Sequence, residues 1–263
     1  MHEYWHRQDN NSPLYEEIVW AKPENKRHRK RLVIVGGNTH AFMQVAASYD
    51  RSIEAGIGDC RVVLPDKLEK VIGKSIENVV YLPSDSSGGI SKDAITAMHQ
   101  YSEWGDGILF PGELGHGSET TRFAEQFINE TKLPLVLSGD SIEVFFSHPK
   151  TIFDTENAVL MLSINQLQKM APELGLATPV THKIGLVKLV ELLQEITENR
   201  ETMLVTNHES NIIVAMYGEV STTPRTFSND WQLSVAPKAA VYLLQHPEKP
   251  FQAVTTSVLD GLD

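Results

Sequence analysis

Short apolar runs alternate along the chain with longer segments in which apolar residues recur every three or four positions. Short runs bounded by Gly, Pro, Asn or Asp predict buried strands, and the three-to-four spacing predicts amphipathic helices. Strands are predicted at residues 31–37, 60–65, 77–83, 106–112, 133–140, 157–163, 202–208 and 211–218. Helices are predicted at residues 41–58, 91–104, 118–132, 164–175, 182–200, 235–246 and 250–262.

This alternation predicts the fold class. Strands that alternate with helices form right-handed βαβ units, which give an α/β fold with a mostly parallel sheet covered by helices on both faces. The last two predicted strands are separated by a short turn, so we expect them to pair with each other. No repeat or linker interrupts residues 31–263, so we expect one domain there, preceded by an N-terminal arm at residues 1–30. Residues 13–21 of the arm predict a short helix or a segment packed on the domain.

Composition and charge limit the functions that this domain can have. The net charge of −11 argues against non-specific binding to nucleic acid or to an anionic membrane. No apolar stretch reaches the roughly 18 residues of a membrane helix, and the polar N-terminus lacks the apolar core of a signal peptide. The single cysteine, Cys60, fits a reducing compartment, and we interpret it as a buried strand residue. We therefore expect a cytoplasmic protein with no nucleic-acid or membrane partner.

Two local features could still mark a ligand. The basic run KRHRKR at residues 26–31 precedes the first strand of the domain. It is either a solvated approach to the sheet or a contact to an anionic ligand over the sheet edge. His2, His6 and His28 lack the spacing of a metal site, so no metal cage is predicted.

Ligands of open α/β sheets bind beyond the carboxyl ends of the strands, so the loops that follow the strands are the candidate site. These loops are GGNTH, PGELGHG, LSGDS, the segment around Ser163, and the turn before the last two helices. Gly36, Gly37 and Asn38 form either a tight turn or a close backbone approach to a ligand. The loop at residues 111–117 contains Gly112 and Gly115 and can expose backbone N–H groups to an anion, or it can simply connect a strand to a helix capped by Ser118.

Three polar residues on these loops have alternative readings. Asp140 could serve a ligand or a magnesium ion, or it could cap the segment that follows it. His116 could donate to a phosphate or be an ordinary surface histidine. Asp230 is either a turn residue or an acid/base, and Ser234 is a natural N-cap that would place Pro237 in the first turn of its helix.

The order and spacing of these loops resemble the ADP-dependent NAD(P)H-hydrate dehydratase family of the ribokinase-like fold. The resemblance runs from about residue 26 to the end of the chain. Six motifs of the family are echoed in order: a lysine-containing segment before the first strand, a GGS strand end, a GAGL turn, a PGLG loop, an LDADAL strand end and a PFEA turn. The PGLG loop has one residue inserted in this chain. The matching positions are Lys26, residues 32–38, 54–58, 111–115 and 137–142, and the segment PFQAV near the end. The resemblance implies a three-layer sandwich and a site for ADP or ATP with magnesium, and it makes a homo-oligomer the expected assembly.

The chain departs from the family where the family's chemistry lies. The GYTGA loop is replaced by residues 40–44 (HAFMQ), the HPGE segment by residues 163–166 (SINQ), and the lysine of the LKG strand end by Thr206, next to Asn207. The GTGD signature falls on residues 231–234 (WQLS), where Ser234 has no acid or base group usable near neutral pH without an activating partner. Asp230 would replace the missing aspartate only if the loop slipped by four residues.

The resemblance and these departures lead to three alternative functions. The first is a catalytically impaired relative of the dehydratases that binds a nucleotide, another small ligand or a protein partner. The second is an active ADP- or ATP-dependent dehydratase that uses Asp140 and Asp230. The third is a small-molecule kinase on the same fold. The residues expected to contact a ligand are Lys26, Gly36, Gly37, Asn38, Gly112, Gly115, His116, Asn207 and Ser234.

Overall fold

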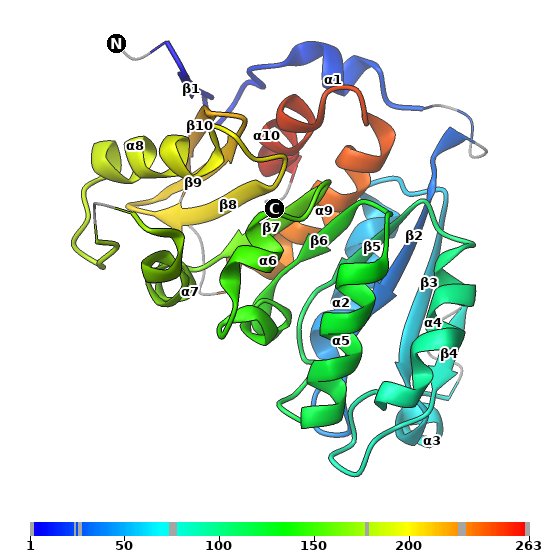
Figure 1. The fold of residues 1–263 in the computed structure, drawn as a ribbon. Helices are drawn as coiled ribbons and strands as arrows, with labels where there is room; N and C mark the ends of the chain where they lie inside the picture. Colours follow the sequence, from blue (N-terminus) through cyan, green and yellow to red (C-terminus); the bar gives the residue numbers. More distant parts are fainter. Residues whose placement is uncertain are drawn as a thin grey trace.

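A computed structural model describes residues 3–23, 25, 28–73, 78–176, 179–225 and 230–260. Its centre is a ten-stranded sheet with the order β1-β10-β9-β8-β7-β6-β5-β2-β3-β4 (Figure 1). The strands are β1 (Trp5–Arg7), β2 (Arg31–Val35), β3 (Asp59–Pro65), β4 (Val79–Leu82), β5 (Gly107–Phe110), β6 (Leu135–Leu137), β7 (Ala158–Leu162), β8 (Met203–His208), β9 (Asn211–Met216) and β10 (Glu219–Pro224). Among the strand pairs of the described residues, only β8–β9 and β9–β10 are antiparallel. The predicted α/β class with a mostly parallel sheet is confirmed.

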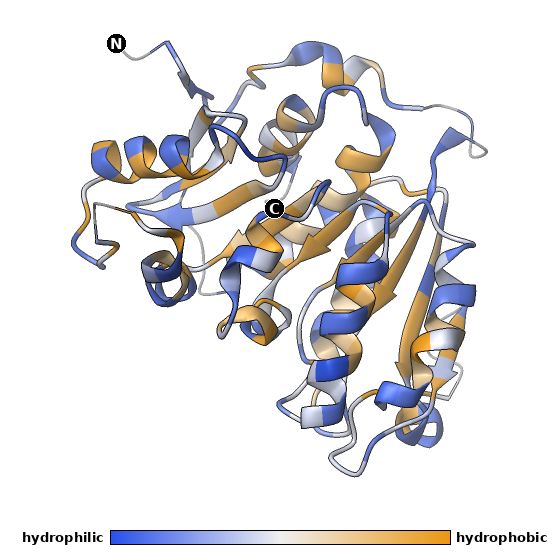
Figure 2. Ribbon diagram, in the orientation of Figure 1, coloured by the Kyte–Doolittle hydropathy of each residue, from blue (hydrophilic) through white to orange (hydrophobic). Residues whose placement is uncertain are grey.

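Helices cover both faces of the sheet, which makes the three-layer sandwich. One face is covered by α4 (Ile95–Ser102), α5 (Ser118–Glu130), α6 (Pro149–Phe153), α7 (Ile164–Met170) and α8 (Leu186–Thr197). The other is covered by α2 (Met43–Glu54), α3 (Glu69–Ile72), α9 (Trp231–Gln245) and α10 (Pro250–Asp260), and α1 (Glu16–Trp20) packs against α10. Figure 2 shows apolar strands between helices whose polar residues face outwards.

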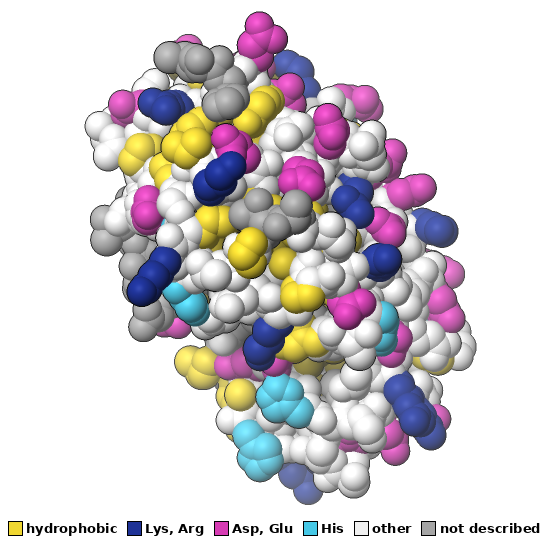
Figure 3. Space-filling view, turned by 60° about the vertical axis from the view of Figure 1, so that its left-hand side comes forward, with side chains coloured by type: hydrophobic (Ala, Val, Ile, Leu, Met, Phe, Trp, Pro, Cys, Tyr) yellow, Lys and Arg dark blue, Asp and Glu magenta, His cyan; other side chains and the backbone are white. Residues whose placement is uncertain are grey.

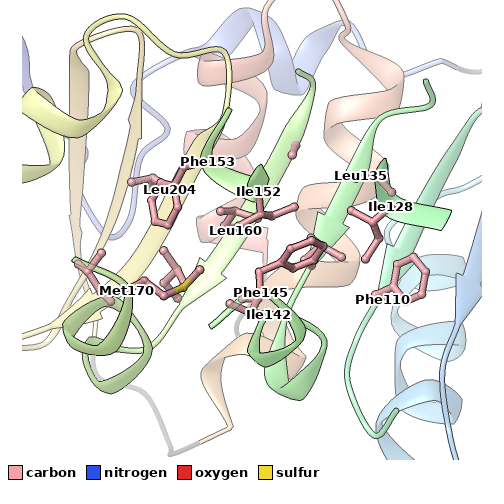
Figure 4. Close-up of a cluster of buried hydrophobic side chains, with 14 of the residues drawn as sticks. Phe110, Ile128, Leu135, Ile142, Phe145, Ile152, Phe153, Leu160, Met170 and Leu204 are labelled. Carbon is pink, nitrogen blue, oxygen red and sulfur yellow. The ribbon is translucent and has the colours of Figure 1, made fainter. Parts of the chain in front are cut away.

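The two apolar cores lie between the sheet and these helix layers. Figure 4 shows part of the first, where Phe110, Leu135 and Leu160 of three strands meet side chains of the covering segments, including Phe145 and Phe153. All five side chains are buried. Cys60 is also buried, as predicted, and burial raises the pKa of its thiol, which keeps it protonated and unreactive.

The N-terminal segment is built into the sheet, because β1 pairs in parallel with β10. Strand β10 was not predicted, since its sequence EVSTTP has no apolar run. Its buried hydroxyls are instead satisfied by hydrogen bonds. Trp5 Nε1 donates to Thr222 Oγ1 at 3.0 Å, Gln8 Nε2 donates to Thr223 Oγ1 at 3.1 Å, and Ser221 Oγ lies 2.7 Å from Thr255 Oγ1.

Two predicted N-caps are wrong. Helix α5 begins at Ser118, but its N-cap is Gly117. Helix α9 begins at Trp231, with Asp230 as N-cap, so both Ser234 and Pro237 lie inside the helix. Proline cannot donate to the carbonyl four residues before it, and that carbonyl, on Leu233, instead accepts a hydrogen bond from Arg51 Nη1 at 3.2 Å. A tertiary contact thus compensates for the proline.

Replacing Arg51 with methionine should therefore destabilise the protein by about 1 kcal/mol, because the Leu233 carbonyl loses its donor. Urea-induced unfolding measures this loss. Arg51→Lys keeps a donor and should recover part of it, whereas removal of the exposed charge in Lys70→Met should cost less than about 0.5 kcal/mol. Equal stabilities for Arg51→Met and Lys70→Met would show that the contact contributes nothing.

Within the described ranges, no helix combines the length and apolarity needed to cross a bilayer. Figure 3 shows acidic and basic side chains interspersed over one face of the molecule.

Candidate functional site

An open hollow of about 710 Å³ lies beyond the carboxyl ends of β2, β4, β5 and β6. The loops that follow these strands form its walls. Its lining residues are Asn38, His40, Ala41, Gln44, Ser87, Gly89, Glu113, Leu114, Gly115, His116, Gly117 and Asp140. Three of the five predicted rim loops therefore meet in one place.

The glycine-rich loop after β5 is folded around a carboxylate of the chain itself. Asp140, just beyond β6, accepts a hydrogen bond from Leu114 N at one carboxylate oxygen and from Gly115 N at the other, each at 3.1 Å. Gly112 and Gly115 have φ of +116° and +81°, which lets the loop curl and turn these N–H groups towards Asp140. Two loop amides that were predicted to bind a ligand anion therefore bind the carboxylate of Asp140 instead.

A second internal carboxylate occupies the N-terminus of α2. Glu113 Oε2 accepts a hydrogen bond from Gln44 N at 2.8 Å, and the N–H of Val45 also donates to this carboxylate. Burial raises the pKa of Glu113 above its ordinary value of 4.5, the two backbone hydrogen bonds oppose that rise, and the charge of Asp140 adds to it. The sequence analysis missed Glu113, whose only signal was an acidic residue inside a glycine-rich loop.

Gly36, Gly37 and Asn38 support the loops and leave little room for a ligand beneath them. A Cβ on Gly36 would lie 2.7 Å from the carbonyl oxygen of Gly112, so the loops after β2 and β5 touch at this point. Gly37 has a φ of +76°, as a tight turn requires. Asn38 Nδ2 donates to the carbonyl of Glu113 at 2.8 Å, and Asn38 Oδ1 accepts from His40 N. The tight-turn reading accounts for all of these contacts.

A third acid beside the hollow is also satisfied internally. Asp85 accepts hydrogen bonds from Ser87 Oγ at 2.7 Å, Thr120 Oγ1 at 3.1 Å and Gly89 N at 3.1 Å. Burial tends to raise the pKa of Asp85, but these hydrogen bonds outweigh it and lower the pKa below its ordinary value. Asp85 is therefore a structural carboxylate that fixes the loop after β4.

Neutral amides close the rim next to this hollow. Ser163 and Gln166 form the predicted capping box at the start of α7, and Gln166 Nε2 donates to the carbonyl of Gly139 at 2.8 Å. Gln232, in the first turn of α9, donates to the carbonyl of Met161 and lies 3.5 Å from Gln166 Oε1. Trp231 beside it is buried. The first turn of α9 thus packs onto the sheet edge through uncharged groups.

The other predicted site residues are dispersed. Asn207 is half-buried in β8, Asp230 is exposed at the start of α9, and Ser234 is half-buried within α9. None of them is among the described residues that line the hollow. Lys26 and the residues 226–229 before α9 lie outside the described residues. The described ranges contain no group of three His, Cys, Asp or Glu side chains that could hold a metal ion.

The sheet order, the two helix layers and the hollow beyond the strand ends define a protein of the ribokinase-like fold. A ribokinase-like superfamily protein from Enterococcus faecalis is 15% identical, with a TM-score of 0.72 over 97% of this chain and 86% of its own. The ADP/ATP-dependent NAD(P)H-hydrate dehydratase from Bacillus subtilis, co-crystallised with ATP and Mg²⁺, is 12% identical, with a TM-score of 0.66 over 95% and 87%. Adenosine kinase from Anopheles gambiae, in complex with a di(adenosine) tetraphosphate, is 11% identical, with a TM-score of 0.56 over 98% and 94%.

No protein-family model matches the sequence, and no curated protein matches it either. At identities of 11–15% the structural likeness shows the shared fold. The sequence resemblance to the hydrate dehydratases is confirmed at that level.

Proposed function

We propose that this chain is a catalytically impaired relative of the NAD(P)H-hydrate dehydratases that binds a small ligand at the rim hollow and does not dehydrate it. One observation carries the proposal. Four backbone N–H groups of this rim, on Gln44, Val45, Leu114 and Gly115, are already bound to the carboxylates of Glu113 and Asp140. A phosphate that approached the same amides would have to displace these carboxylates, which belong to the chain itself, and would be repelled by their negative charge.

The remaining polar groups support a ligand held by hydrogen bonds from side chains. His40, Gln44 and His116 line the hollow together with Glu113 and Asp140. Such a set suits a ligand rich in hydroxyl or amide groups, such as a nucleoside or a sugar. ADP and ATP with Mg²⁺ are the first ligands to test, because the Bacillus subtilis dehydratase was co-crystallised with ATP and Mg²⁺.

The alternative of an active dehydratase depends on Asp140 and Asp230. Both carboxylate oxygens of Asp140 accept hydrogen bonds from loop amides. Asp230 is exposed and is not among the residues that line the hollow. Neither arrangement favours proton transfer to a substrate in the hollow. A small-molecule kinase would meet the same difficulty. The cytoplasmic location and self-association stay predictions.

Incubation of the pure protein with NADH hydrate, ADP or ATP, and Mg²⁺ should give no recovery of NADH absorbance above the buffer rate. The Bacillus subtilis enzyme serves as the positive control. Recovery that is lost in Asp230→Ala, an exposed position whose replacement should leave folding intact, would overturn the proposal in favour of the active enzyme. A rise in melting temperature with ADP or ATP, without turnover, would identify the ligand as a nucleotide.

A further inference from the structure

A second pocket lies at the ends of the strands opposite the rim hollow, under the turn between α9 and α10. It has a volume of about 160 Å³. Its walls are mostly apolar and come from the amino ends of β6–β8, the carboxyl end of β9 and the end of α9. They include Pro134, Val159, Met203, Met216, Leu243 and Leu244.

The apolar walls of this pocket are well sheltered from solvent. Met203, Met216 and Leu244 are 1%, 7% and 5% exposed. An apolar cavity of roughly 150 Å³ stays dry and accepts a molecule of the size of benzene. The pocket therefore has room for an apolar group of about six carbon atoms.

A polar hollow of about 820 Å³ adjoins the pocket, since both are lined by Lys30 and Asp106. Asp106 is already satisfied, because its Oδ2 accepts Arg31 N at 2.8 Å and lies 3.6 Å from Arg31 Nε. Lys30 is exposed, and its side chain makes no ion pair with any described residue. Its carbonyl accepts Gly58 N at 3.0 Å, which fixes its backbone at the pocket mouth.

The other acidic wall residue does not neutralise Lys30. Glu201 precedes β8, whereas Lys30 precedes β2, and these strands are four positions apart in the sheet. At about 4.8 Å per strand their backbones lie roughly 19 Å apart. Asp59 also lines the polar hollow, where its Oδ1 accepts hydrogen bonds from Cys60 N at 2.9 Å and Asn78 Nδ2 at 3.2 Å. Lys30 is thus a cation at the pocket mouth that makes no ion pair with a carboxylate of the described residues.

We propose that this pocket binds a small carboxylate whose apolar chain of about six carbons enters it and whose anionic group faces Lys30. The site lies at the opposite strand ends from the rim hollow, so it does not rest on the function proposed there. It also gives a role to Lys30 of the basic segment before β2, which is not among the residues that line the rim hollow.

Three probes with the same chain test this proposal on the full chain: hexanoate, hexanamide and hexylammonium. The readout is the ¹³C-methyl NMR signal of the methionines, assigned with Met203→Leu and Met216→Leu. Hexanoate should shift the methyls of Met203 and Met216 with a dissociation constant on the order of 1 mM. Met43, 68% exposed at the start of α2 beside the rim hollow, should not shift.

Lys30→Asn removes the charge without straining the backbone, because Asn tolerates the left-handed φ of 61° found at this position. Hexanoate should bind the natural protein about threefold more tightly than hexanamide, and Lys30→Asn should abolish this difference. Leu243→Trp, checked for folding by its melting temperature, should fill the pocket and abolish binding of both.

Two results would overturn the proposal. The first is the absence of a saturable shift at Met203 and Met216 up to the solubility limit of hexanoate, which needs no variant to interpret. The second is tighter binding of hexylammonium than of hexanoate, which would assign the mouth to cations.

Discussion

Asp140→Ala is expected to lower the free energy of unfolding by about 3 kcal/mol. The Asp140 carboxylate accepts two backbone hydrogen bonds, from Leu114 and Gly115, and hydrogen bonds to a charged group contribute about 1.5–3 kcal/mol each. Alanine leaves both N–H groups without their acceptor in a half-buried loop. The loss should appear as a shift of the urea midpoint with an unchanged slope, since the folded and unfolded states keep their surface areas.

Two variants in the same hollow give the comparison. Asp140→Asn keeps one carbonyl oxygen as acceptor, so it should lose about half as much stability. His116→Ala, at an exposed lining position, should change the stability by less than about 0.5 kcal/mol. An Asp140→Ala variant as stable as His116→Ala would mean that the loop does not need the carboxylate. Asp140 would then be available for a ligand, and the proposed loss of catalysis would lose its main support.

The sequence predicted the architecture well because most of the core strands are apolar runs. The strands from β2 to β9 all coincide with predicted segments. Strand β10 escaped because its buried side chains are hydroxyls, whose partners Trp5, Gln8 and Thr255 are more than thirty positions away in the chain. Hydrophobic periodicity reveals a buried strand only when the buried side chains are apolar.

The start of α9 was misplaced for a similar reason. Proline is preferred in the first turn of a helix, so Pro237 together with Ser234 predicted a start near Ser234. The structure tolerates the proline in mid-helix because Arg51, from α2, donates to the carbonyl that the proline leaves free. A local rule cannot anticipate a donor that tertiary folding brings from another element.

The sequence predicted where the candidate site lies, but not that carboxylates of the chain itself bind its backbone amides. Asn38, Gly115, His116 and Asp140 follow three different strands, and the rule that such loops meet at one rim placed them together. The sequence could not show that the Asp140 carboxylate points into the glycine-rich loop, nor that Glu113 turns back onto α2. Those directions depend on backbone angles such as the φ of +60° at Glu113.

The two internal carboxylates give a physical account of how this rim could lose an anion without losing its fold. A loop of exposed N–H groups is costly to keep empty, because each group needs an acceptor. In a phosphate-binding protein the ligand or water supplies the acceptor. Here Asp140 and Glu113 supply it permanently. The loops are thereby fixed in the absence of any ligand.

The pH dependence of stability should reveal the cost of keeping Glu113 charged. Its pKa is raised in the folded state, so the folded protein holds this proton more tightly than the unfolded chain does. The resulting stabilisation is complete below the ordinary value of 4.5 and is lost as the pH rises through the raised pKa. Relative to Glu113→Gln, which does not titrate, the natural protein should therefore lose stability across this window. A constant difference in unfolding free energy between the two proteins would contradict the assignment.

Glu113→Gly should also restore anion binding at the start of α2. The substitution removes the competing carboxylate from the N–H groups of Gln44 and Val45, and glycine adopts the φ of +60° without strain. Charge-assisted hydrogen bonds of this kind contribute about 1.5–3 kcal/mol, so inorganic phosphate and ADP should bind at least about tenfold more tightly than to the natural protein. Isothermal titration calorimetry measures both. Glu113→Gln is the matched control, because its amide oxygen still occupies the N–H groups while the negative charge is gone. Equal phosphate affinity in the Gly and Gln variants would show that charge alone, and not occupancy of the amides, excludes the anion.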